Sequence, residues 1–372
     1  MTTAWIDGQP VSSGEAIREA VRLLSTSRLP LVTGRFDDIS ALREAARVAG
    51  FSGGVLDHLD LDKVAPLIEA LRDNGIIRVS PGEMRRRADR VLVVGADPFA
   101  KSEAVFEQIF SVDPDLGAKT KGEPREIVLL GPDGPGRFSE AKGNVRTIAC
   151  PSDDLGDAIG ILRAALGGKP FNDGPFEEGA ARALAGWLKD AGFAAIVFDA
   201  GELDAIAIEG VAGLVSDLNA ETRASALPLA AGSAYGAAEG AIWSTGFPLR
   251  TAFGRGDPEQ DMALNDGGQL LASGESDARL VLTYDDGALD AADVPTVLLS
   301  PAEEPAGEGA HVVFKIGRPG VDHPMVHHEP RFGSFVSKPA EHSGMATNAA
   351  DILSAIADQL GKVHHSNDEA RA

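Results

Sequence analysis

The residues best suited to chemistry lie in the stretch 241–256. This stretch holds three large aromatic and two basic side chains, namely Trp243, Phe247, Phe253, Arg250 and Arg255. The two guanidinium groups could donate paired hydrogen bonds to carboxylate or phosphate oxygens, while the aromatic rings form a wall beside them. The same residues also suit a buried Ω-type loop whose arginines pair with carboxylates of the protein itself. Residue types alone leave both interpretations open.

Residues 241–256 follow neither a helical nor a strand period. Three glycines and one proline interrupt the apolar residues, so we expect an ordered loop. A loop this rich in large side chains is usually packed against the protein or built to hold a ligand.

Three other groups of residues could bind ions. Asp97 follows a glycine at the end of an apolar run, a place where anions bind in α/β proteins. Residues 85–87 are three consecutive arginines, which point in different directions on a helix and therefore favour separate salt bridges. His323, His327 and His328 could meet a zinc ion on a helix, but Pro324 interrupts that helix. His364 and His365 stand in the terminal tail, where we expect them to be solvated.

Composition excludes several classes of protein. The 372 residues include 34 basic and 56 acidic side chains, which give a net charge of −22. Such a chain is repelled by nucleic acid and by anionic membrane surfaces. We expect two domains of ordinary size and, because no apolar run approaches 18 residues, a cytoplasmic protein.

Cysteine usage is equally restrictive, because Cys150 is the only cysteine. One thiol cannot form an intramolecular disulfide, a four-thiolate iron–sulfur cluster or a four-cysteine zinc site. We expect Cys150 to be a small buried hydrophobe at the end of a strand. The sequence also lacks the Gly-Lys-Ser/Thr, G-x-G-x-x-G and G-x-S-x-G motifs in a suitable context.

Apolar runs of strand length alternate with helical patterns along most of the chain. We expect strands at 29–34, 54–57, 76–79, 91–95, 127–131, 145–148, 194–198, 224–229, 280–283, 296–299 and 311–316. Helical patterns cover 16–24, 39–48, 64–71, 102–110, 153–166, 176–189, 203–218, 262–271 and 348–360, with a short helix starting near 80. Residues 317–342 read as a loop and 366–372 as a frayed end. The alternation predicts an α/β fold with two doubly wound parallel sheets.

Several segments, in this order, resemble one family. Residues 29–34, 54–57, 80–89 and 94–98, the loop 243–248 with 253–256, and more loosely 317–322, are similar to the beta subunit of tungsten or molybdenum formylmethanofuran dehydrogenase. The resemblance covers most of residues 14–330. It implies two interleaved, Rossmann-like α/β domains of the molybdopterin-oxidoreductase type. One domain would comprise 14–57 plus 232–330 and the other 58–231, followed by a C-terminal loop, helix and frayed tail at 331–372.

The departures from that family concern its metal ligands. Active members carry an N-terminal cysteine cluster for a [4Fe–4S] centre and a cysteine or selenocysteine metal ligand after the strand at 54–57. Here both regions lack cysteine, although Asp60 or Asp62 could in principle ligate a metal. Without the ligands of the iron–sulfur domain and of the cofactor, this chain resembles the beta subunit of the bacterial formyltransferase/hydrolase complex.

This second resemblance implies a structural subunit with no catalytic residue, no metal and no cofactor of its own. Its partners would be a zinc hydrolase subunit, a formyltransferase subunit and a third scaffold subunit. Together they would pass a formyl group from formyl-tetrahydromethanopterin through methanofuran and release formate. A vestigial cofactor site would be marked by Trp243, Thr245, Gly246, Phe247, Arg250, Arg255 and Asp97.

Two alternatives remain, namely a working molybdenum or tungsten dehydrogenase subunit and a binding module for methanofuran. In the second, Arg250 and Arg255 would hold the polyglutamate-type tail of that molecule. For a structural subunit we expect a stability that depends on its partners. We also expect Trp243, Phe247 and Phe253 to fill the space of a pterin, so that Trp243→Ala would cost roughly 3–5 kcal/mol. Arg250 and Arg255 would then pair with carboxylates of the protein.

Overall fold

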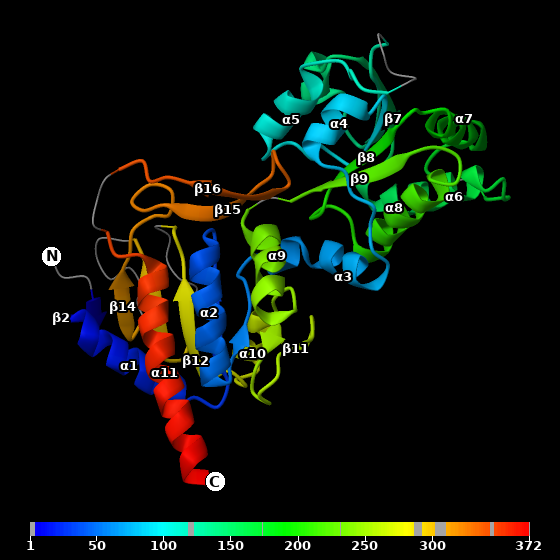
Figure 1. Cartoon of the computed structure of the whole chain (residues 1–372). Helices are drawn as coiled ribbons and strands as arrows, with labels where there is room; N and C mark the ends of the chain where they lie inside the picture. The colour runs from blue at the N-terminus through cyan, green and yellow to red at the C-terminus, as the bar shows by residue number, and fades with distance from the viewer. Residues whose placement is uncertain are drawn as a thin grey trace. The chain divides into compact units, whose positions relative to one another are not determined.

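The computed structural model describes residues 4–117, 123–172, 174–230, 232–285, 292–301, 310–342 and 346–371, with side chains up to residue 363. The chain forms two compact α/β units (Figure 1). Unit 1 comprises Met1–Leu61, Gly232–His328 and Phe335–Ala372. Unit 2 comprises Asp62–Ala231 and the short segment Glu329–Ser334.

Unit 2 is built on a five-stranded parallel sheet in the order β7-β6-β5-β8-β9. Its strands are β5 (Arg90–Val94), β6 (Glu126–Gly131), β7 (Asn144–Ala149), β8 (Ala194–Asp199) and β9 (Ala224–Leu229). The earliest strand, β5, lies in the middle, because the chain first winds outward to β7 and then returns to place β8 on the other side of β5. The strand order therefore reverses between β5 and β8, which is the switch point of a doubly wound sheet.

Apolar side chains cover both faces of the unit 2 sheet. Val91 and Val93 of β5 share a buried cluster with four phenylalanines, Phe99, Phe106, Phe110 and Phe138. Phe106 and Phe110 belong to α5 (Glu103–Phe110), which contacts α4 (Pro81–Arg87), while Phe99 follows β5 and Phe138 follows β6. The other helices are α6 (Leu155–Leu166), α7 (Glu178–Lys189), α8 (Ala205–Leu218) and α3 (Ala65–Asp73), and Figure 1 shows α6, α7 and α8 grouped away from α4 and α5. Two covered faces explain why β5 is a continuous apolar run.

Arg125 is a fully buried cation in unit 2. Its guanidinium donates hydrogen bonds to the carbonyl oxygens of Arg85 at 2.9 Å, Ala88 at 2.9 Å, Ile109 at 2.7 Å and Val112 at 3.3 Å. These carbonyls stand at the C-terminal ends of α4 and α5, where helices leave acceptors unpaired and carry partial negative charge. Burial lowers the pKa of Arg125 to about 10, but the side chain stays protonated at neutral pH.

Unit 1 contains a nine-stranded sheet in the order β11-β10-β4-β3-β12-β13-β14-β1-β2. The five central strands are parallel, namely β4 (Val55–Leu56), β3 (Pro30–Gly34), β12 (Ala278–Leu282), β13 (Thr296–Ser300) and β14 (Val312–Lys315). The antiparallel edges are β10 (Thr251–Ala252), β11 (Glu259–Gln260), β1 (Ala4–Ile6) and β2 (Gln9–Val11). The strand order reverses between β3 and β12, which gives unit 1 its own switch point.

Helices α1 (Ser13–Thr26), α2 (Ile39–Ser52) and α11 (Ala349–Arg371) form one layer of unit 1, with α11 contacting both of the others (Figure 1). A capping box between Ser12 and Glu15 begins α1. Leu270 of α10 (Gly267–Ala272) packs against Leu31 and Val55 of the sheet. Within the described parts of the chain, every helix is too short or too polar to cross a membrane.

The structure corrects four expectations from the sequence. Residues 241–256 are not all loop, because helix α9 (Ala234–Thr245) includes the first five of them. The expected strand at 76–79 is a single bridge from Arg78 to Ala226. The expected loop at 317–342 contains a hairpin of β15 (Met325–Glu329) and β16 (Ser334–Lys338). The frayed end expected at 366–372 is wrong as far as Arg371, because α11 continues to that residue.

Candidate functional site

The switch point of unit 1 is the first place to look for a site, because open α/β sheets bind ligands at the carboxyl ends of strands where the order reverses. Arg35 and Asp37 follow β3, while Tyr284 and Asp285 follow β12. Arg35 forms ion pairs with Asp60, at 2.7 Å, and with Asp285. Asp60, which the sequence offered as a metal ligand, is therefore engaged by a cation of the same unit.

A row of three hydrogen-bonded side chains lies beside this cluster. His58 is buried, and its Nδ1 accepts a hydrogen bond from the backbone N–H of Asp60 at 3.0 Å. The proton of the neutral ring is then on Nε2, which lies 3.2 Å from Ser233 Oγ and donates to it. Ser233 in turn donates to Asp37, whose pKa is raised mainly by burial. This donor order is opposite to that of a serine nucleophile, because His58 donates to the hydroxyl instead of accepting from it.

Tyr284 completes the switch point of unit 1. Its hydroxyl is buried and has no hydrogen-bond partner among the described residues. Burial first, and then the neighbouring carboxylates Asp38 and Asp37, raise the pKa of Tyr284, so the phenol stays protonated. The cluster therefore offers hydroxyl donors and carboxylates, and its cation, Arg35, is already paired with Asp60 and Asp285.

Arg250, a candidate from the sequence, lies in the interior of unit 1. Its guanidinium donates to the carbonyl oxygen of Met262 at 2.5 Å, forms an ion pair with Asp266, and lies 3.7 Å from Asp57. Asp57 follows β4. It accepts hydrogen bonds from the backbone N–H groups of Gly267, at 2.8 Å, and of His58, at 2.7 Å. Burial raises the pKa of Asp57 to about 6. The expected pairing of Arg250 with protein carboxylates is thus confirmed.

The other candidates of the stretch 241–256 are not gathered around Arg250. Gly246 ends α9 in the left-handed region, with a φ of 82°, and the Thr245 hydroxyl accepts from the Phe247 N–H at 3.0 Å. These residues form a helix cap. Arg255 is paired as expected, with Glu259 at 3.5 Å, but its side chain is 83% exposed.

Trp243 is where the sequence interpretation was wrong. Its side chain is 65% exposed, and only Phe253 of the expected aromatic filling is buried, while Phe247 is half-buried. The large loss of stability expected for Trp243→Ala therefore no longer follows, because an exposed side chain leaves no cavity when it is removed.

The switch point of unit 2 is filled by Glu202, a residue that the sequence did not single out. Both carboxylate oxygens of Glu202 lie 2.9 Å from the backbone N of Ala96, which begins the turn after β5. Gly95 has a φ of 94°, and a Cβ atom there would lie 2.2 Å from Glu202 Oε2. Asp97 accepts from the Phe99 N–H at 2.9 Å and is paired with Arg137. The chain's own carboxylate thus takes the position that an anionic ligand would occupy.

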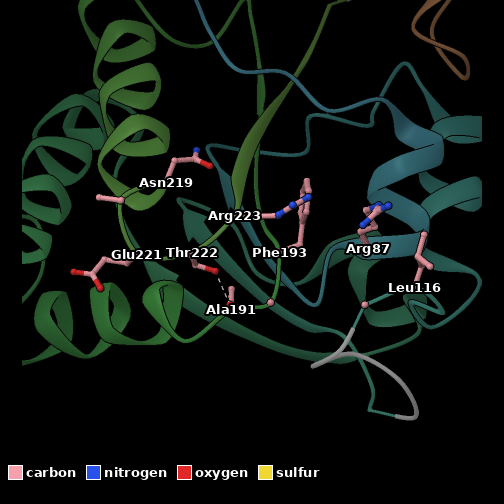
Figure 2. A pocket seen from close by; sticks show the side chains of 11 residues that line it. Arg87, Leu116, Ala191, Phe193, Asn219, Glu221, Thr222 and Arg223 are labelled. Carbon is pink, nitrogen blue, oxygen red and sulfur yellow. Dashed lines mark hydrogen bonds between the residues drawn. The ribbon is translucent and has the colours of Figure 1, made fainter.

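A cavity of about 560 Å³ opens in unit 2, away from these residues (Figure 2). Phe193 and Arg223, which line it, come directly before β8 and β9, at the amino ends of the strands. Arg87 also lines it and pairs with Glu83 at 3.3 Å, while Arg86 pairs with Asp115 at 3.0 Å. The separate salt bridges predicted for these arginines are confirmed. Of the candidate residues from the sequence, Arg87 lines this cavity and the others lie elsewhere.

Comparison with known proteins places the fold in context. No family model matches the chain. It is 32% identical to the beta subunit of the formyltransferase/hydrolase complex Fhc of Methylorubrum extorquens, over 96% of this chain and 98% of that protein. The chain belongs to the family of Fhc beta subunits. It also matches a chain in the crystal structure of the complex FhcABCD from Methylorubrum extorquens with methylofuran, with a TM-score of 0.84 and 30% identity over 97% and 99% of the two chains.

A more distant relative of this Fhc family member is the beta subunit of tungsten-containing formylmethanofuran dehydrogenase 2 from Methanocaldococcus jannaschii. It is 25% identical over 85% of this chain and 76% of its own length. In the part of this chain that the structure describes, no three His, Cys, Asp or Glu side chains are grouped so as to hold a metal ion. His327 and His328 are consecutive in β15 and therefore point to opposite faces. The side chains of His364 and His365 lie outside the described residues.

The buried carboxyl of Asp57 should make the stability of this protein depend on pH. Its pKa is about 6 in the folded state against 3.8 ordinarily, so the folded state binds the proton more tightly than the unfolded state. Asp57 therefore contributes stability at low pH that is lost as the pH rises from about 4 to about 6, worth up to about 3 kcal/mol. In urea titrations we expect the free energy of unfolding of Asp57→Asn to rise by this amount relative to that of the wild type as the pH increases across that range. A difference that stays constant with pH would contradict the assignment.

Proposed function

We propose that this chain is a structural, non-catalytic subunit of a formyltransferase/hydrolase complex. The single observation that carries the proposal is the full-length match to a chain of FhcABCD, over 97% of this chain and 99% of the other. In this complex a zinc hydrolase subunit and a formyltransferase subunit perform the chemistry, and a third subunit assists this chain as scaffold. Together they move a formyl group from formyl-tetrahydromethanopterin to methanofuran and hydrolyse it to formate in the cytoplasm.

The fold we propose is that of a molybdopterin oxidoreductase without its iron–sulfur domain. Support comes from the order of the two units along the chain, because the main segment of unit 2, Asp62–Ala231, is inserted between two segments of unit 1. Both sheets also have doubly wound strand orders, with the first parallel strand beside the switch point.

The residues at the two switch points do not fit a pterin dinucleotide, whose phosphates require cations or free backbone N–H groups. In unit 2 the Ala96 N–H is taken by Glu202, whose pKa is raised by burial and by the neighbouring carboxylates Asp199 and Asp133. In unit 1 the cation at the switch point, Arg35, is already paired with Asp60 and Asp285, and Arg250 is enclosed by Asp57 and Asp266 in the interior. Burial raises the pKa of Cys150 to about 11, so this thiol is a poor metal ligand. These contacts support a chain that works without a cofactor, and we derive no catalytic step through one.

The vestigial residues that we propose form a separate remnant in each unit. Asp97 with Glu202 is the remnant in unit 2, and Arg250 with Asp57 is the remnant in unit 1. The other candidates have different roles. The cap of α9 is formed by Thr245, Gly246 and Phe247. Trp243 and Arg255 face solvent. The enclosed guanidinium of Arg250 disfavours the alternative in which it holds the tail of methanofuran.

Purification of the tagged chain from cells that also produce its three partners tests the proposal. We expect native mass spectrometry to find all four kinds of subunit, and elemental analysis of the separated chain to find no stoichiometric molybdenum, tungsten or iron. We also expect the isolated chain to melt below the assembled complex, because partner binding stabilises the folded state. A chain that carries one of these metals, or that never associates with the other subunits, would refute the proposal.

A further inference from the structure

Helix α9 presents its largest apolar side chains outward, which is the reverse of an ordinary amphipathic helix. Its buried residues are all small, namely Ala234, Gly236, Ala237, Ala238, Gly240 and Ala241. Ile242 and Trp243 are 46% and 65% exposed. Large apolar side chains gathered outside a core mark an interaction site more often than scattered single residues do.

Close packing explains why the inner side of α9 contains only small residues. A Cβ atom on Gly240 would lie 2.5 Å from Ile39 Cδ1 of α2, and a Cβ atom on Gly236 would lie 2.6 Å from His328 Cβ of β15. The helix backbone therefore touches its neighbours directly and leaves no space for a larger side chain. Ile242 and Trp243 consequently add little to the core of unit 1.

The exposed indole is held in position by a row of rings from three elements, α9, β15 and β16. The Trp243 ring lies 4.5 Å from the Phe335 ring of β16, which lies 5.6 Å from the His328 ring. The His328 ring lies 5.4 Å from that of Tyr235, whose hydroxyl donates to Glu239 at 2.6 Å. A side chain that is already ordered loses less entropy when a partner covers it.

We define the aromatic patch as Ile242, Trp243 and Phe335. We propose that the aromatic patch is a docking surface for another subunit of the complex, which covers Trp243 with an apolar pocket rimmed by lysine or arginine. This inference rests on the proposed function.

Charge selects this occupant over a second copy of the chain. The only charged side chain of α9 is Glu239, and the whole chain carries a net charge of −22. A symmetric contact between two copies would bring the same carboxylates together, because a two-fold interface uses the same surface twice. A partner with basic residues around its pocket gains attraction instead.

The test compares binding of purified variants to the sub-complex of the other three subunits, measured as Kd by biolayer interferometry. Trp243→Ala should weaken binding roughly 30-fold, the size of effect found for buried tryptophan anchors. Leu264→Ala is the matched control, since Leu264 is 74% exposed in the same unit but outside the aromatic patch. It should bind within about twofold of the wild type. Phe335→Leu, which removes the ring under the indole, should lie between the two.

Thermal melting of each free variant separates binding from folding. We expect Trp243→Ala to melt close to the wild type, because its indole is mostly exposed. A loss of binding below about tenfold, or a loss equal to that of Leu264→Ala, overturns the inference while the proposed function stands. Self-association of the free chain that Trp243→Ala abolishes assigns the aromatic patch to a second copy and also overturns it. Failure of the wild type itself to bind refutes the proposed function together with the aromatic patch.

Discussion

Replacing Arg125 by methionine should lower the free energy of unfolding of unit 2 by about 3–5 kcal/mol. Methionine fills much of the same volume but donates no hydrogen bond. The four carbonyl oxygens at the ends of α4 and α5 would lose their hydrogen-bond donor at a site that is fully buried from solvent. Each buried acceptor without a partner costs about 1–3 kcal/mol, and relaxation of the helix ends recovers part of the sum.

Trp187 of α7 allows unit 2 to be followed separately. The other two tryptophans, Trp5 and Trp243, belong to unit 1 and can be replaced by phenylalanine in both wild type and variant. Urea unfolding monitored by Trp187 fluorescence then measures the effect. The control is Arg182→Met, which removes an exposed arginine paired with Glu178 and should cost less than about 1 kcal/mol. If Arg125→Met unfolds at the same urea concentration as Arg182→Met, the buried arginine does not hold the helix ends.

Replacing Arg250 by methionine should destabilise unit 1 by about 3–5 kcal/mol at neutral pH. The change removes the cation between Asp57 and Asp266 and leaves Asp57 with a buried charge that already ionises reluctantly. Residue 250 has a φ of 44° and follows Leu249, whose φ is 72°. Methionine would keep this strained turn but lose the contacts by which Arg250 holds it. Adding Asp57→Asn to Arg250→Met should recover part of the loss, because it removes the unpaired charge.

Arg255 provides the matched control for Arg250. It lies five residues further along, is 83% exposed and pairs only loosely with Glu259, so Arg255→Met should change stability by less than about 0.5 kcal/mol. The measurement is urea unfolding followed by Trp5 and Trp243 with Trp187 replaced. Equal midpoints for the two variants, or no recovery in the double variant, would show that Arg250 is not the required counter-ion.

The sequence predicted those elements whose burial leaves a pattern in the chain. Strands such as β5 and β12 are covered on both faces and therefore appear as continuous apolar runs. Helix α9 escaped notice because alanine and glycine on its inner side give no apolar period. The hairpin of β15 and β16 escaped because its strands are half-exposed and carry histidine and charged residues.

The candidate site was predictable only in part, for two physical reasons. The pairing of Arg250 followed from the cost of burying an unpaired guanidinium, and the structure bears this out. The position of Trp243 did not follow, because apolar residues are common on surfaces and a large ring alone does not indicate burial. Glu202 and Arg125 were missed because their partners lie 106 and up to 40 residues away along the chain, a distance that no local pattern reports.

The insertion of unit 2 into unit 1 has a consequence for synthesis on the ribosome. Strand β3 pairs with β12, so Leu31 meets Arg279, and the central sheet of unit 1 cannot be completed until β14, which ends at Lys315, has been made. All five strands of unit 2 are complete once Leu229 has emerged. Because domains fold as units during translation, unit 2 should acquire its fold while β3 and β4 still lack β12, the neighbour of β3 in the sheet. Those two apolar strands are thus exposed for the time that about 220 residues take to be added, which makes them the stretch that chaperones most need to protect.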